Sequence, residues 1–283
     1  MLVCILVILL ILAALVIFMV APGRRRKEPR TPFLYINYAH RGLFSRDQSI
    51  PENSLPAFEA AAKAGYGIEL DVQFTSDRKL VVFHDDRLDR MTPEKGWVQD
   101  HDWKTVGSLP LAGTAYTVPL FSQVLETVGG RVPLIVEIKS RVEYSGAYLD
   151  DLCRQTLQAL EGYKGLYCIE SFDPRVLRRI RRMAPRVLRG QLVDSYRANR
   201  KQGVRPVHAF LLSHAFGNFL GRPDFIAWCP DRENWAIALC RLLGAMMVQW
   251  TMVPELDWQE EQQRYDALIF QWYTPDPNYG VPA

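Results

Sequence analysis

Residues 67–85, GIELDVQFTSDRKLVVFHD, contain two short apolar runs with a polar turn between them. We predict strands at Gly67–Gln73 and Leu80–His84, because apolar runs of this length bounded by turn residues are typical of strands. Acidic or histidine side chains stand at or near the end of both runs. The stretch therefore predicts a sheet whose strand ends carry chemistry.

The same pattern continues on both sides of this stretch, from Leu34 onward. The other predicted strands are Leu34–Ala39, Pro133–Lys139, Leu166–Glu170, Val187–Val193, Asp224–Trp228, Ala245–Trp250 and Ala267–Gln271. Apolar residues at three- and four-residue spacing predict helices between them at Leu55–Lys63, Tyr148–Leu160, Pro174–Met183 and Trp235–Leu243. Gly, Pro and Asn interrupt the pattern in Asp194–Arg222, which indicates a functional loop or an extra helix.

Alternating strands and helices predict an α/β fold of parallel strands. A (β/α)8 TIM barrel usually needs about 250 residues, which is what remains after the N-terminal segment. An open doubly wound sheet would use the same elements, although no G-x-G-x-x-G turn follows the first strand to favour a dinucleotide fold. With nine candidate strands for the eight places of a barrel, periodicity alone leaves these two architectures open.

The N-terminal segment differs in composition from the rest. Met1–Val20 carries no charged side chain, and a helix of that length spans about 30 Å, enough to cross a bilayer core. We predict an anchor at 1–22, a basic linker at 23–33 and a catalytic domain at 34–283. A cleaved signal is disfavoured because the cations follow the apolar run, at Arg24, Arg25, Arg26 and Lys27. These cations predict a single-pass protein of the cell membrane with a cytoplasmic catalytic domain.

Bulk charge and cysteine usage limit the classes of partner. The formal net charge is only +3, which gives no indication of a nucleic-acid partner. The five cysteines are an odd number without zinc-like spacing, which favours isolated thiols in a reducing compartment. Nothing in the sequence indicates an oligomeric state.

Three carboxylates stand on predicted strands. Glu69 and Asp71 are two residues apart, so their side chains point to the same side, and Glu137 could supply a third oxygen ligand. Oxygen ligands without cysteine favour Mg²⁺ or Ca²⁺. The alternative is that these acids pair with neighbouring basic groups, because three unpaired carboxylates would repel one another.

Two histidines, His40 and His84, stand at predicted strand ends. Imidazole exchanges protons near neutral pH, so the pair is suited to general acid and base catalysis. Arg41 and Lys139 are candidate donors to a phosphate group. Structural roles are the alternatives, including salt bridges from both cations to the carboxylates.

An ordered set of motifs carries a resemblance to a known family. The blocks are Ala39-His40-Arg41-Gly42, Pro51-Glu52-Asn53-Ser54, Glu69-Leu70-Asp71-Val72, His84-Asp85, Glu137-Ile138-Lys139, Ser171-Phe172 and Trp250-Thr251. In order and spacing the chain resembles the glycerophosphodiester phosphodiesterases, within the superfamily of phosphatidylinositol-specific phospholipase C-like phosphodiesterases.

The resemblance implies a (β/α)8 barrel and a set of residue roles. Glu69, Asp71 and Glu137 would hold the divalent cation, with Glu52 as a further candidate. His40 and His84 would be the catalytic acid and base. In the family's usual scheme one histidine deprotonates a glycerol hydroxyl that attacks phosphorus, the other protonates the departing alcohol, and water opens the cyclic phosphate. The substrate contacts would be Arg41, Lys139, Asn53 and Trp250, although for Asn53 loop and helix-cap duty is the favoured interpretation.

Some positions depart from the family pattern. Met252-Val253 follows Trp250-Thr251 where the family has a Val-Asn pair, and the last strand ends in Gln271-Trp272 where an Asp is common. The region after His84, Leu88–Pro119, is short; in this family it covers the site. These departures leave the alcohol head group of the substrate open.

Three functions are compatible with the sequence. The first is hydrolysis of glycerophosphodiesters to glycerol 3-phosphate and an alcohol. The second is lysophospholipase D-type hydrolysis of membrane lysophospholipids, which would use the anchor. The third is a membrane-tethered binding protein without catalysis, which is disfavoured because none of the motif histidines or acids is missing.

Overall fold

The computed structural model describes residues 1–23, 28–229 and 231–280. The cations Arg24, Arg25, Arg26 and Lys27, on which the predicted membrane orientation rests, lie outside the described residues.

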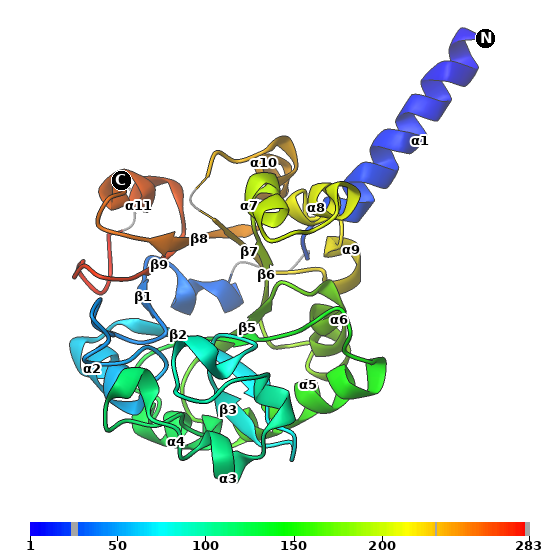
Figure 1. The fold of residues 1–283 in the computed structure, drawn as a ribbon. Coiled ribbons are helices and arrows are strands. Elements are labelled where there is room, and N and C mark those ends of the chain that lie inside the picture. Colours follow the sequence, from blue (N-terminus) through cyan, green and yellow to red (C-terminus); the bar gives the residue numbers. More distant parts are fainter. Residues whose placement is uncertain (24–27, 230, 281–283) are drawn as a thin grey trace.

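Eight parallel strands close into a barrel (Figure 1). β1 pairs in parallel with both β2 and β9, so the sheet has no free edge along the barrel wall. This closure confirms the (β/α)8 barrel and excludes the open doubly wound sheet. The barrel strands are β1 (Asn37–His40), β2 (Gly67–Phe74), β4 (Leu134–Ile138), β5 (Tyr167–Ser171), β6 (Arg189–Val193), β7 (Phe225–Trp228), β8 (Met246–Met252) and β9 (Ala267–Phe270).

The one remaining strand of the described residues, β3 (Leu80–Val82), is not part of the barrel wall. The sequence suggested that His84 ends a parallel strand, and this was wrong, because β3 runs antiparallel to β2. β2 continues past the barrel rim, and β3 turns back along it with Val82 opposite Val72. The hairpin therefore returns the chain to the carboxyl end of β2.

Helices cover the outside of the barrel. α2 shows why they begin and end where they do: the Ser54 hydroxyl accepts the Ala57 N–H, and Gly65 ends the helix with φ of 81°. The helices are α1 (Leu2–Val20), α2 (Leu55–Ala64), α3 (Trp103–Val106), α4 (Phe121–Val128), α5 (Gly146–Glu161), α6 (Pro174–Met183), α7 (Tyr196–Lys201), α8 (Pro206–Ser213), α9 (Asn218–Gly221), α10 (Trp235–Leu242) and α11 (Trp258–Arg264), with short 3-10 turns at Glu28–Phe33, Leu88–Arg90, Val98–Asp100 and Leu111–Gly113.

The strands bury both of their faces, which follows from their alternation. On β2, Ile68, Leu70 and Val72 belong to the larger apolar core with residues of the covering helices. The intervening Glu69 and Asp71 alternate with these residues, and Glu69 lies opposite Ile135 of the smaller apolar cluster in the parallel register. These acids therefore occupy the opposite face of β2, which is the inside of the barrel.

Two segments add structure outside the basic repeat. Residues after His84, including Leu88, Val98 and Leu111, form a small apolar cluster with Val81 and Phe83. The interrupted region Asp194–Arg222, predicted as a loop or an extra helix, contains α7, α8 and α9.

α1 projects from the barrel (Figure 1). It has 19 residues with a mean hydropathy of 3.6 and is almost wholly exposed, so by length and composition it can cross a membrane. A signal sequence would have the same properties, and the helix by itself does not distinguish the two.

Candidate active site

The predicted site residues meet at the carboxyl ends of the first barrel strands. Asp71 on β2 lies opposite Glu137 on β4 in the parallel register, and Glu69 is one pleat further back on β2. The β2–β3 hairpin brings His84 to the same level, because the Phe83 N–H donates to the Asp71 carbonyl oxygen over 3.0 Å. A pocket of about 1030 Å³ is lined by His40, Arg41, Glu69, His84, Glu137, Lys139 and Trp250, among others.

Glu69, Asp71 and Glu137 form a cluster that fits a divalent cation. Each offers a carboxylate oxygen within 4.8 Å of the others, and all three side chains are buried. Burial raises the pKa of Glu69 well above its usual range, and the charge of Asp71 adds to this effect. Burial likewise raises the pKa of Glu137 to about 7. Carboxylates that resist ionisation when alone need a positive charge between them, and an all-oxygen set suits a hard cation.

Lys139 provides part of that positive charge. Its ammonium lies 3.1 Å from Asp71 Oδ1 and 3.1 Å from Glu137 Oε1. Burial opposes ionisation of Asp71, but the charges of Lys139, His84 and Arg41 together with the hydrogen bond from Asn53 outweigh it and hold the pKa of Asp71 well below its usual range. Here Lys139 takes the salt-bridge role that was the alternative to phosphate binding, while it also lines the pocket.

Asn53 contacts the carboxylate cluster through a hydrogen bond. Its Nδ2 donates to Asp71 Oδ2 over 2.8 Å, and its side chain is buried with Oδ1 unpartnered among the described residues. The backbone adopts φ of 53°, a left-handed conformation that Asn tolerates better than most residues. Asn53 is therefore placed to orient a carboxylate of the cluster.

His40 lies between the cluster and the last strand. Its Nδ1 is 2.8 Å from Gln271 Oε1, which can only accept, so Nδ1 carries the proton and Nε2 has the lone pair. Nε2 lies 3.8 Å from Glu69 Oε2. Burial and the neighbouring Arg41 charge lower the pKa of His40 well below its ordinary value. Gln271, which departs from the family pattern, thus fixes the orientation of His40.

His84 is oriented by the residue that follows it. The Asp85 carboxylate accepts from Nδ1 over 2.6 Å and also accepts from Arg90. Burial and then the charge of Lys139 lower the pKa of His84, while Asp85 and Asp71 act in the opposite direction. The net effect is a lowered pKa of His84, and the role of Asp85 is to fix the orientation and tautomer of the ring.

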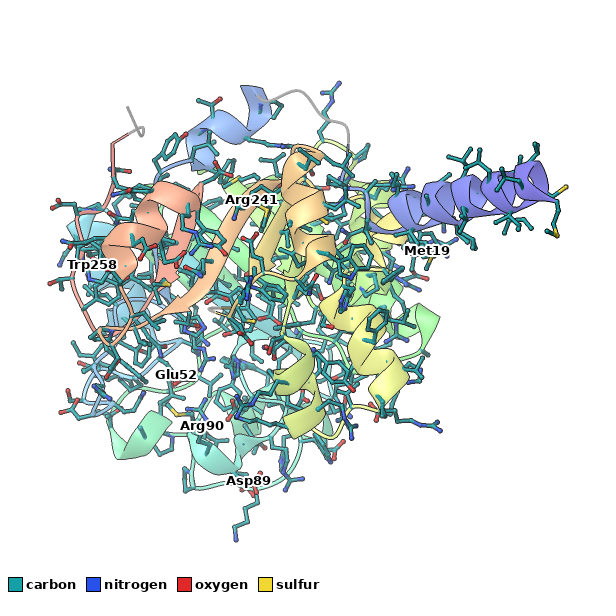
Figure 2. The ribbon with its side chains drawn as sticks, turned by 90° about the horizontal axis from the view of Figure 1, so that it is seen from above. Met19, Glu52, Asp89, Arg90, Arg241 and Trp258 are labelled. Atoms are coloured by element: carbon teal, nitrogen blue, oxygen red, sulfur yellow. The ribbon has the colours of Figure 1, made fainter. Side chains whose placement is uncertain are left out.

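Glu52 pairs with arginines. Its Oε1 accepts from Arg41 over 2.7 Å and from Arg90 over 2.6 Å, and Figure 2 shows Glu52 and Arg90 side by side. Within the described residues the metal-capable cluster does not include Glu52, which was a further candidate ligand. Arg41 also donates its backbone N–H to Glu69 Oε2 over 3.1 Å. Glu52 thereby links the Arg41 and Arg90 guanidinium groups into one network beside the cluster.

Trp250, a predicted substrate contact, lines the pocket. Its ring packs edge-on against Phe172 with centroids 5.4 Å apart, and its Nε1–H donates to the Ala227 carbonyl oxygen over 2.9 Å. The ring is therefore held in place independently of any bound substrate.

Several residues of the pocket were not predicted from the sequence. Glu170 lies opposite Glu137 in the register of β5 and β4 and is 1% exposed, with Oε2 unpartnered among the described residues. Burial raises its pKa well above the usual range, and Glu137 contributes to this. The period of two along its predicted strand was the signal available for Glu170. Trp97 and Asp194, which also line the pocket, come from irregular segments that gave no such signal.

The sequence matches a family described as "Glycerophosphoryl diester phosphodiesterase family" over residues 40–227. A glycerophosphodiester phosphodiesterase of Caldanaerobacter subterraneus is 30% identical over 256 residues, which cover 84% of this chain and 93% of the relative. A glycerophosphodiester phosphodiesterase of Bacillus subtilis is 29% identical over 263 residues, covering 85% of both chains.

Solved structures share the barrel. A phosphodiesterase of Oleispira antarctica, in complex with the product sn-glycerol-3-phosphate, superimposes with a TM-score of 0.66 at 21% identity, covering 84% of this chain and 93% of that one. A glycerophosphodiester phosphodiesterase of Thermotoga maritima gives a TM-score of 0.60 at 23% identity, covering 83% and 93%. At these identities the likeness establishes the fold.

Proposed function

We propose that this chain, which belongs to the glycerophosphoryl diester phosphodiesterase family and is a glycerophosphodiester hydrolase, works by two-histidine catalysis with a divalent cation. The products would be glycerol 3-phosphate and an alcohol. The observation that carries the proposal is a cluster of three buried carboxylates at the wall of a pocket that both histidines line.

The cation would be held by Glu69, Asp71 and Glu137, with Asn53 orienting Asp71. When bound, a divalent cation supplies charge neutralisation at the phosphoryl oxygens and a lower pKa for a nearby hydroxyl. The all-oxygen set is compatible with Mg²⁺ and with Ca²⁺. Arg41, which lines the same pocket, is the residue that would donate its guanidinium to the phosphate.

The hydrogen bonds of the two histidines suggest their roles. His40, whose Nδ1–H is donated to Gln271, keeps a lone pair on Nε2 and would take the proton of the attacking glycerol hydroxyl. His84, beside the Asp85 carboxylate, would carry a proton and give it to the departing alcohol oxygen as the P–O bond breaks. Water would then open the cyclic phosphate, with the two proton transfers reversed.

The test is release of glycerol 3-phosphate from glycerophosphocholine by the full chain in detergent micelles, with and without EDTA. We expect turnover that EDTA abolishes and added Mg²⁺ or Ca²⁺ restores. His40→Ala should lose it, while His101→Ala, outside the pocket lining, should not. Lysophosphatidylcholine is assayed in parallel: choline release from this lipid alone would favour the lysophospholipase D alternative. Turnover of neither substrate would favour the binding protein without catalysis.

We also propose that α1 anchors the chain in the cell membrane with the barrel in the cytoplasm. The support is the apolar composition of α1 and the four cations that follow it in the sequence. A reporter fused at residue 1 should be found outside the cytoplasm; a cytoplasmic reporter would overturn the orientation.

A further inference from the structure

The end of α1 is fixed to the barrel by specific contacts. Asn218 Nδ2 donates to the Val20 carbonyl oxygen over 2.8 Å, and Arg222 Nη1 donates to the Phe18 and Ala21 carbonyl oxygens over 2.8 and 3.0 Å. The last carbonyls of a helix have no partner within it, so these bonds satisfy groups that would otherwise be unpaired. α1 therefore leaves the barrel in a defined direction beside α9 and α10 (Figure 1).

α8 is linked to α1 through α10, because Asn234 at the start of α10 bonds Ser213 at the end of α8 and α10 contacts α1. The large apolar side chains of α8 face away from the barrel. The helix buries only its small residues Ala209 and Ser213. Its large apolar side chains are exposed, by 69% at Val207, 42% at Phe210, 38% at Leu211 and 42% at Leu212. A surface helix of a soluble protein usually buries such residues, so this face indicates an apolar environment.

The start of α10 extends the same apolar face. Asn234 Nδ2 donates to the Ser213 carbonyl oxygen over 2.7 Å and so joins the two helices. The next residue, Trp235, is 51% exposed and packs against His214 with centroids 5.5 Å apart. Tryptophan is enriched where a membrane meets water.

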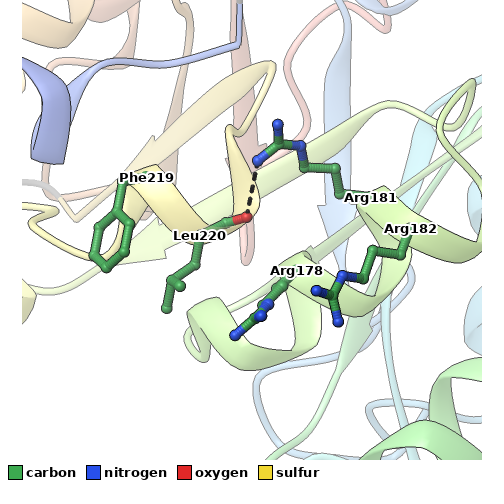
Figure 3. Close-up of a pocket in the computed structure, with 5 residues that line it drawn as sticks. All are labelled: Arg178, Arg181, Arg182, Phe219 and Leu220. Atoms are coloured by element: carbon green, nitrogen blue, oxygen red, sulfur yellow. Dashed lines mark hydrogen bonds between the residues drawn. The ribbon is translucent and has the colours of Figure 1, made fainter.

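Three arginines of α6 lie where that helix packs against α9. Arg178, Arg181 and Arg182 line a pocket of about 440 Å³ with Phe219 and Leu220 (Figure 3). This pocket adjoins α1, because the Phe219 and Phe18 rings are 5.9 Å apart. Arg181 Nη1 donates to the Leu220 carbonyl oxygen over 3.3 Å.

The charge of this arginine pocket is largely uncompensated. Elsewhere on α6, Arg175 pairs with Asp173 and Arg179 with Asp150. Across the described residues, no acidic group lies within 4.0 Å of the guanidinium groups of Arg178, Arg181 or Arg182. Planar guanidinium groups around a shallow pocket match the geometry of a phosphate.

We propose that α8, Trp235 and the arginine pocket form one membrane-contacting face around the end of α1, and that the pocket binds the phosphate of an anionic phospholipid. A helix that crosses the bilayer places its end at the headgroup level, and the fixed junction places α8 and the pocket there as well. The apolar side chains enter the interface while Phe219 and Leu220 contact the first part of the lipid. The contact holds the barrel in one orientation on the membrane.

The test uses the full chain in phosphatidylcholine vesicles that contain a quencher-bearing lipid, with and without phosphatidylglycerol. An environment-sensitive fluorophore is attached to one thiol at a time, because among the cysteines only Cys4 is exposed. Native Cys4, within α1, reports insertion. In the Cys4→Ser background, Leu212→Cys reports the proposed face and Tyr116→Cys is the matched control, since these residues are 42% and 43% exposed.

We expect the fluorophore at Leu212→Cys to shift to shorter wavelength and to be quenched by the lipid, and the one at Tyr116→Cys to do neither. Phosphatidylglycerol should increase the quenching at Leu212→Cys, and Arg178→Glu with Arg182→Glu should remove that increase. Equal, unquenched emission at both positions while Cys4 is quenched would overturn the proposal. A shift to shorter wavelength at Leu212→Cys that depends on protein concentration, without quenching by the lipid, would also overturn the proposal. It would indicate that a second copy of the chain covers this face. Quenching unaffected by the arginine substitutions would refute the lipid-phosphate site.

Discussion

The Nδ1 atom of His84 lies 2.6 Å from Oδ1 of Asp85. The carboxylate can only accept, so this contact sets the tautomer of the ring and leaves Nε2 as the nitrogen available to a substrate. Arg90 holds Asp85 from the other side, with Nε 2.6 Å from Oδ2. The orientation of His84 is therefore determined by a chain of charged groups that ends at Glu52.

Asp85→Asn should reduce kcat for glycerophosphodiester hydrolysis by about 10²- to 10⁴-fold. The amide can donate to Nδ1 and so favours the opposite tautomer of His84, which is unsuited to the proposed proton transfer. Steady-state kinetics on glycerophosphocholine measure the effect. Asp89→Asn, which alters an exposed carboxylate bound to Arg87, is the control and should keep wild-type kcat. A wild-type kcat for Asp85→Asn would contradict the orienting role.

Lys139→Met should destabilise the metal-free protein. The substitution removes the ammonium between Asp71 and Glu137, and loss of one partner of a buried ion pair costs about 3–5 kcal/mol. In EDTA the Tm should fall by roughly 10 °C. Added Mg²⁺ or Ca²⁺ should recover much of the loss, because a cation bound to the folded state stabilises it. Lys63→Met, which removes an exposed surface pair with Glu59, should leave Tm nearly unchanged. Equal melting of Lys139→Met and the wild type in EDTA would contradict this account.

Substitutions at Asn53 should separate its backbone role from its side-chain role. Asn53→Gly keeps the left-handed backbone at no steric cost, whereas Asn53→Ala adds about 1 kcal/mol of strain, or about 2–4 °C in Tm. Both lose the hydrogen bond to Asp71, so both should lower metal affinity to a similar extent. Thermal melts and metal titrations measure the two effects. Similar Tm values but unequal metal affinities for Asn53→Gly and Asn53→Ala would contradict this division between backbone and side-chain roles.

Glu233 gives a pH-dependent contribution to stability. Burial disfavours its ionised form, but the hydrogen bonds from Arg241 and Tyr265 together with the charges of Arg241 and Arg264 outweigh this and lower its pKa. A lowered pKa in the folded state gives stability that is present above the unfolded-state pKa and is lost as pH falls through the folded value. Glu233→Gln should therefore lower Tm by about 2–4 °C at pH 7, and the difference should shrink towards zero in acid.

The comparison for Glu233 is Glu255→Gln, which removes an exposed pair with Arg46 and should have little effect on Tm at either pH. A difference between Glu233→Gln and the wild type that stays constant from pH 7 into acid would show that the carboxylate charge is not its cause.

The barrel and the cluster of acids could be predicted because both follow from strand alternation. A period of two places Glu69 and Asp71 on one face, and the parallel register brings Glu137 beside them. The same period places Glu170 on that face, but a lone acid on a strand does not stand out without its neighbours. The direction of β3 could not be predicted, because alternation is the same in parallel and antiparallel strands.

The partners of the charged side chains in the site could not be predicted from the sequence either. Glu52 is adjacent to the motif residues in sequence, yet its partner Arg90 is 38 positions away. Only the folded chain shows that Arg90 reaches Glu52 and Asp85 together. Lys139 has the same ambiguity in sequence between phosphate and carboxylate partners, and the distances to Asp71 and Glu137 show which it contacts here.

The segment after His84 has an apolar cluster of its own, built mainly from residues such as Leu88, Val98 and Leu111, and it also supplies Trp97 to the pocket wall. Its packing is largely separate from that of the barrel core. Substitution of Trp97 can therefore reshape this wall without disturbing barrel closure, whereas Arg90, which lies in the same segment and holds Asp85 and Glu52, ties the segment to the orientation of His84.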